Sequence, residues 1–178
     1  MYTQMKRNPL DRLTKGKVVL IGDACHPMLL SKARPLPNCL CQAPPFFRTK
    51  SVSPPAHAQG VSSSIEDAAA LEILLADLPP SESTSSPPSE TLLKRLQIFQ
   101  SLRLPRVSAT QILTDSVPPG PGAGPAQDKK VEEIRKYYQG PLPPKDAFPH
   151  SEPICQFFFA YDVRAEAEKA LKEAEVTA

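Results

Sequence analysis

Hydrophobic positions along the chain form one continuous run and several repeats at helical spacing, which predict one strand and several helices. A continuous apolar run over residues 17–22 predicts a buried strand. Leucines at helical spacing predict long helices over 61–78 and 90–116. Shorter helices are expected at 127–138 and 162–175, and the second of these is expected on the surface because it has little apolar face.

Proline-rich and serine-rich segments separate the predicted elements. A Ser/Pro break covers 79–89, and a Pro/Gly tract that is typical of a linker begins beyond Val117. The 22 prolines and the 6% aromatic content argue against one continuous core. Core candidates lie on the second long helix: Leu96, Phe99, Leu102 and Leu113.

The end of the apolar run and the start of the first long helix carry the candidate chemistry. A strand that ends in Gly22-Asp23 delivers a carboxylate to the open edge of an α/β sheet, where ligands bind. An ionised Asp only accepts hydrogen bonds, so Asp23 suits a sugar-like hydroxyl, although it could also cap the following turn. Gln59-Gly60-Val61 stands where the unpaired amides of a helix start face outward.

These two segments belong to longer motifs. They read Gly-Asp-Ala-Cys-His-Pro-Met over 22–28 and Ala-Gln-Gly-x4-Ile-Glu-Asp-Ala over 58–68. Together they resemble a flavin-binding region of FAD-dependent aromatic-ring monooxygenases, in particular the fungal salicylate hydroxylase-like branch. The resemblance implies that Asp23 contacts the ribityl chain of FAD and that the helix start faces the N1/O2 edge of the flavin. The implied cofactor-binding residues are Gly22, Asp23, Gly60, Val61 and Ser62.

The resemblance implies only a portion of such an enzyme. These monooxygenases are usually more than twice as long and open with a Gly-x-Gly-x-x-Gly turn, whereas the only dense glycine run here, at 120–124, is interleaved with proline. The expected fold is α/β, an incomplete Rossmann-like FAD-binding domain fragment, mostly helical after one core strand and with long Pro-rich loops. Residues 1–117 are expected to form the C-terminal part of that domain, and 118–178 a linker and C-terminal helical tail.

One segment interrupts the resemblance. Between the two motifs the family has a short connection, but here 29 residues, Leu29 to His57, intervene. We interpret 31–56 as an insertion, either a translated intron or a genuine surface loop such as a lid or a partner-binding segment.

Other charged and reactive residues admit more than one interpretation. Arg103 and Arg106 lie on adjacent turns of one helix face, which suits pairing with carboxylates as well as a solvated basic stripe. Glu66 and Asp67 suit the dipole of their helix and are interpreted as structural. His26, followed by proline, is expected to shape its loop, so no catalytic residue is assigned. No Cys-x2-Cys pair occurs, and no metal site is expected.

Charge and hydropathy argue against nucleic-acid-binding and membrane-associated functions. A net charge of +2 suggests neither nucleic acid nor an anionic membrane as a partner, and no run is long enough to cross a bilayer. Because the first residues also lack the apolar core of a signal peptide, a cytoplasmic location is expected. The resemblance implies FAD, NAD(P)H as co-substrate and a small aromatic substrate, and the missing N-terminal half could be supplied in trans. The alternatives are an inactive truncated homologue or a non-enzymatic interaction protein that uses Pro-rich segments such as Pro87-Pro88 and 141–144.

Overall fold

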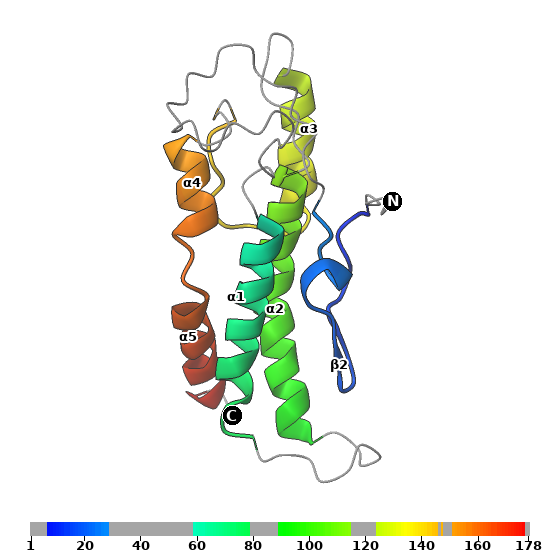
Figure 1. The fold of residues 1–178 in the computed structure, drawn as a ribbon, viewed down its shortest axis with the longest axis vertical. Helices are drawn as coiled ribbons and strands as arrows, with labels where there is room; N and C mark the ends of the chain where they lie inside the picture. The colour runs from blue at the N-terminus through cyan, green and yellow to red at the C-terminus, as the bar shows by residue number, and fades with distance from the viewer. Residues whose placement is uncertain are drawn as a thin grey trace, which may run out of the picture.

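Two long helices form the centre of the fold and lie side by side (Figure 1). They are α1, Gln59–Leu75, and α2, Glu90–Thr114. A third helix, α5, Val163–Val176, packs against both of them, while α3, Gly124–Arg135, lies beside the C-terminal end of α2. The short helix α4, Glu152–Phe159, precedes α5 on the same side of the molecule. The computed structural model describes residues 7–28, 59–78, 89–114, 124–145, 147 and 151–176.

The core lies where one face of each long helix meets α5 and the N-terminal segment. Because residues three or four apart share one side of a helix, the apolar side chains of α1 and α2 form two facing stripes. The main cluster comprises Leu13, Cys25, Ala70, Leu74, Phe99, Val107, Val163 and Ala167. A smaller cluster of Ala109, Ile112 and Ile134 joins α2 to α3.

The N-terminal segment forms a small hairpin and a turn beside the long helices. Strand β1, Thr14–Lys15, pairs antiparallel with β2, Val18–Val19, and the 3₁₀ turn η1, Gly22–Ala24, follows. The side-chain oxygen of Gln100 on α2 accepts hydrogen bonds from the main-chain N–H groups of Leu13 and Thr14, at 3.0 and 3.2 Å. The hairpin is therefore fixed to α2, and it places η1 against α1.

The prediction of a buried strand over 17–22 is wrong in both length and burial. The strand contains only Val18 and Val19, and the side chains of Val18, Leu20 and Ile21 are 62, 37 and 40% exposed. Its pairing partner among the described residues is the two-residue strand β1, and Val19 packs against the main cluster. The Rossmann-like arrangement stays a prediction, and the mostly helical character is confirmed.

Four of the helices follow the predicted pattern, and one was not predicted. The helices α1, α2, α3 and α5 correspond to the predicted segments with shifted ends. Helix α4 was missed because it has eight residues, too few for a clear period, and begins at a Glu-Pro pair that also suits a turn. Most of α5 is exposed as expected, but Val163 and Ala167 form a narrow buried face.

Several expectations lie wholly or largely outside the described residues. These are the insertion 31–56, most of the break at 79–89 and the start of the Pro/Gly tract. The division into 1–117 and 118–178 stays a prediction. Among the helices that are described, none is long and apolar enough to cross a membrane.

Candidate functional site

The structure brings together the two segments that carry the predicted cofactor contacts. Gly60 lies in the first turn of α1, and a methyl group built on its Cα would lie 3.9 Å from Oδ1 of Asp23 in η1. The Asp23 side chain is exposed. Val61 is 69% exposed and Ser62 half-buried on the same first turn. All five predicted contact residues therefore belong to one small region.

Gly22 is the residue that seats η1 on α1. Its backbone is in the left-handed region, with φ +58°, and a Cβ there would lie 3.1 Å from Oγ of Ser64. Only glycine adopts this conformation without strain and leaves room for Ser64. The Ser64 hydroxyl in turn donates to the main-chain oxygen of Gly60 at 2.7 Å. Ser64 thus contacts both Gly22 in the turn and Gly60 at the start of α1.

A buried carboxylate, Asp67 on α1, binds this turn by hydrogen bonds. Its Oδ2 accepts a hydrogen bond from the Gly22 amide at 3.0 Å and lies 2.7 Å from Nε2 of His26. Its Oδ1 accepts a hydrogen bond from Nε of Arg103 at 2.9 Å. Asp67, His26 and Arg103 all have 0% exposure. His26 therefore shapes its loop, as predicted, through a specific partner on α1.

Arg103 joins α2 to α1 through a fork of hydrogen bonds. Besides Asp67, it donates from Nη1 to Glu66 at 2.7 Å and from Nη2 to the main-chain oxygen of Ser63 at 3.2 Å. The planar guanidinium suits this arrangement because its donors point in fixed directions. Of the two alternatives for the paired arginines, Arg103 is the carboxylate-pairing residue and not part of a solvated stripe.

The electrostatics of this cluster favour its charged form. Burial alone would raise the pKa of Asp67, but the hydrogen bond from His26, the Arg103 charge and the Gly22 amide together lower it. Burial would likewise lower the pKa of Arg103, but the charges of Glu66 and Asp67 raise it. The opposite charges and the hydrogen bonds compensate part of the desolvation cost of both groups.

Arg106, one turn further along α2, is held differently. Its guanidinium stacks between two aromatic rings, 4.4 Å from the centroid of Phe157 and 4.6 Å from that of Tyr161. It also donates to the main-chain oxygens of Phe157 and Phe158 at 2.5 and 3.3 Å. Burial lowers its pKa. Arg106 thus anchors the C-terminal end of α4 and the following Tyr161 to α2 by cation–π and main-chain contacts.

The other end of η1 is fixed by Arg7 and by a buried thiol. The Arg7 guanidinium donates to the main-chain oxygens of Ala24 and Cys25 at 3.0 and 2.6 Å. Burial and the negative charge of Asp67 raise the pKa of the Cys25 thiol to about 12. Because the thiolate is the nucleophilic form, Cys25 is a packing residue and not a nucleophile.

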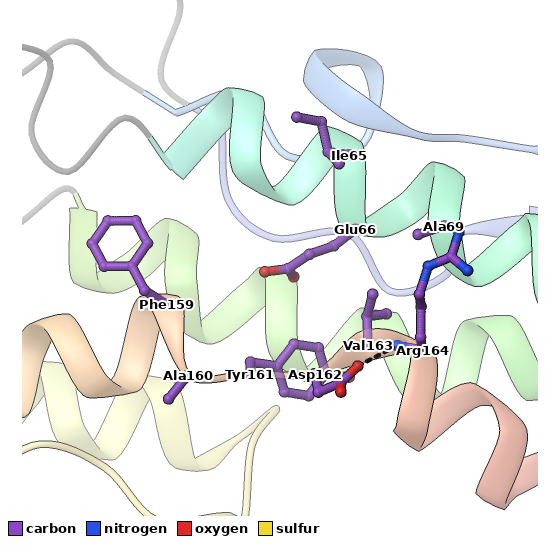
Figure 2. A pocket seen from close by; sticks show the side chains of 9 residues that line it. All are labelled: Ile65, Glu66, Ala69, Phe159, Ala160, Tyr161, Asp162, Val163 and Arg164. Atoms are coloured by element: carbon purple, nitrogen blue, oxygen red, sulfur yellow. Dashed lines mark hydrogen bonds between the residues drawn. The ribbon is translucent and has the colours of Figure 1, made fainter.

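A shallow hollow lies on a neighbouring face, and it does not include the predicted contact residues. It has a volume of about 290 Å³ and is lined by α1 and the segment that joins α4 to α5. Figure 2 shows the Glu66 side chain reaching from α1 toward Tyr161, with Phe159 and Ile65 at the rim. The carboxylate of Glu66 is already paired with Arg103, and the rest of the lining combines apolar and aromatic side chains with Asp162 and Arg164.

The sequence held a signal for the buried cluster that our interpretation missed. Asp67 lies in register with Ala70 and Leu74 on the face of α1 that packs into the core, and Arg103 follows Phe99 on the corresponding face of α2. A charged residue in an apolar stripe is rarely left unpaired. An acidic residue on one such face and a basic residue on the other therefore indicate a buried pair.

Comparison with known proteins identifies similar enzymes. The chain is 30% identical over 167 residues to the FAD-dependent monooxygenase cfoG of Aspergillus candidus. It is 29% identical over 165 residues to the FAD-dependent monooxygenase phomE of Diaporthe leptostromiformis. Both alignments cover 93% of this chain, but the chain spans only 28 and 33% of the length of these relatives. No family model and no solved structure matches. The resemblance to FAD-dependent monooxygenases is confirmed at this level.

Proposed function

We propose, from the similarity of nearly the whole chain to FAD-dependent monooxygenases, that it supplies one side of an FAD site. The observation that carries the proposal is the closeness of the Asp23 carboxylate to Gly60, although the two residues come from separate motifs. This is the pair of groups that the resemblance assigns to the ribityl chain and to the flavin edge. The coarse function, part of an FAD-dependent monooxygenase, rests on the relatives.

The side chains present at this place fit such a cofactor. Asp23 is an exposed acceptor and suits a hydroxyl donor. Gly60 leaves beside it the space that a Cβ would fill. The first turn of α1 carries the positive end of the helix dipole. A hydroxylated chain and a polar ring edge are the groups that these residues would hold.

The chain's own contribution is binding and orientation. FAD, when bound, supplies the redox and oxygen chemistry. Asp23 accepts a hydrogen bond and so fixes position, while the start of α1 places partial positive charge toward an electron-rich group. No proton-transfer role is assigned to His26, because its Nε2 is engaged with Asp67 inside the protein.

The complete reaction is proposed to need more protein than this chain contains. We propose NAD(P)H as reductant and a small aromatic compound as substrate, each bound mainly by the part of such an enzyme that lies outside these 178 residues. That part could belong to a separate polypeptide. The exposed apolar side chains of Val18, Ile21, Val61 and Ile65 are suited to contact it.

The FAD site predicts a specific pattern of variant effects. In wild-type protein, FAD is expected to shift the amide NMR signals of Gly22, Asp23 and Gly60, with an affinity too weak to survive gel filtration. Asp23→Ala is expected to weaken FAD binding about tenfold or more, because it removes a charge-assisted hydrogen bond. Gly60→Ala is expected to weaken FAD binding without lowering the free energy of unfolding, because alanine favours a helix and its methyl group has room.

A matched control separates a site from a general charge effect. Asp77 is an exposed carboxylate beyond the opposite end of α1, so Asp77→Ala should leave FAD affinity unchanged. If FAD shifts no amide in this region, or if both Asp variants behave alike, the proposed function is wrong. A purified protein that keeps FAD through gel filtration would contradict the predicted weak affinity.

The alternative of a Pro-rich interaction protein gains no support from the described residues. Pro87-Pro88 lies outside them. In the segment 141–144, Leu142 packs against the cluster that joins α2 to α3, so part of this segment is used inside the protein.

A further inference from the structure

Asp67 stands where three segments of the chain meet. It lies on α1, seven residues after Gly60, so the rigid helix places it about 10 Å further along the axis. From there its two oxygens reach the amide of Gly22, the ring of His26 and the guanidinium of Arg103. No other described side chain contacts both η1 and α2 in this way.

We propose that Asp67 is a positioning residue that holds the Gly22–Asp23 turn against the start of α1 in the geometry needed for FAD binding. The proposal rests on the proposed function. Asp67 would not touch the cofactor. It acts through the Gly22 amide, whose neighbour Asp23 carries the carboxylate that faces Gly60.

The contacts around Gly22 explain how the single carboxylate of Asp67 holds η1 against α1. The main-chain oxygen of Gly22 accepts hydrogen bonds from the amides of Cys25 and His26, at 2.9 and 2.8 Å, so η1 is a closed unit. Asp67 forms hydrogen bonds to both ends of this unit, to the Gly22 amide and to the His26 ring. Moving η1 away from α1 therefore breaks two hydrogen bonds to one buried charge, which is costly at zero exposure.

Arg103 determines which oxygen of Asp67 is available to η1. It occupies Oδ1 of Asp67, so Oδ2 is left for the turn. Nδ1 of His26 is buried without a hydrogen-bond partner in the described part of the chain, so the hydrogen bond of the ring in that part of the chain is the one to Asp67. The position of η1 is thus set by the hydrogen bonds to Asp67 together with the Arg7 contacts and the packing of Cys25 in the main cluster.

The matched pair Asp67→Ala and Glu66→Ala tests the proposal. Both variants remove one carboxylate partner of Arg103, but only Asp67 touches η1. In the full chain, Asp67→Ala is expected to accelerate hydrogen exchange of the Gly22 amide about tenfold or more, and to weaken FAD binding by a similar factor. Glu66→Ala should change neither, although it too loses stability.

The outcomes are separable from those of the proposed function. Unchanged Gly22 exchange in Asp67→Ala overturns the positioning role whether or not FAD binds. Equal loss of FAD affinity in the two variants also overturns it, because the effect would then be general destabilisation. If FAD shifts no amide in the wild type, the proposed function fails, and with it the cofactor part of the inference. If Asp67→Ala does not fold, Asp67→Asn replaces it in the test. The single side-chain oxygen of Asn cannot accept hydrogen bonds from the Gly22 amide, His26 and Arg103 at once. Asp67→Asn is therefore expected to change Gly22 exchange and FAD affinity in the same direction as Asp67→Ala, but less.

Discussion

Replacing Arg103 by leucine is expected to lower the free energy of unfolding by about 3–5 kcal/mol. The reason is that Asp67 would remain fully buried and Glu66 largely so, without the cation that compensates both. Arg103→Lys keeps the charge but loses the planar fork, so an intermediate loss is expected. Urea unfolding followed by circular dichroism measures the free energy of unfolding of the wild type, Arg103→Leu and Arg103→Lys.

A surface ion pair on the same helix is the control. Lys94 and Glu90 are 63 and 82% exposed, and Lys94→Leu should change the free energy of unfolding by about 0.5 kcal/mol or less. Asp67→Asn should cost less in the Arg103→Leu background than in wild type, because its partner is already gone. Similar losses for Lys94→Leu and Arg103→Leu, or strict additivity with Asp67→Asn, would show that the buried pair is not a stabilising unit.

Replacing Phe99 by alanine is expected to cost about 3–5 kcal/mol, because it leaves a cavity at the centre of the main cluster. Phe99 has 0% exposure and lies among side chains from α1, α2 and α5. Phe99→Leu should cost less because more of the volume stays filled. Thermal or urea unfolding measures the difference.

Phe159 provides the matched aromatic control, since its side chain is 59% exposed at the end of α4. Phe159→Ala should change stability by about 0.5 kcal/mol or less. A large loss for Phe159→Ala together with a small loss for Phe99→Ala would contradict the packing described above.

The helical part of this fold was predictable because its apolar residues repeat at helical spacing. Leu96 and Phe99 are buried as predicted, and Leu102 and Leu113 pack partly buried against the two clusters. The closeness of Asp23 and Gly60 was predictable only through the family resemblance, because no local rule links residues so far apart in sequence.

Other features depend on contacts that periodicity does not encode. The apolar run at 17–22 predicted burial, but burial of a strand requires packing on both of its faces. Here Val19 packs against the main cluster, whereas Val18, Leu20 and Ile21 remain exposed. Which of the two arginines pairs with carboxylates depended on the rotation of α2. Arg103 faces α1, whereas Arg106 faces Tyr161 and the segment before α5.

The shared bonding of Asp67 restricts how this sequence can diverge. A neutral residue at Arg103 leaves Asp67 buried without this cation, and a neutral residue at Asp67 leaves buried Arg103 with Glu66 as its remaining carboxylate partner. An apolar pair at positions 67 and 103 removes the two buried charges together. Accepted replacements at these positions should therefore arise as linked pairs, with the glycine at position 22 retained in each of them.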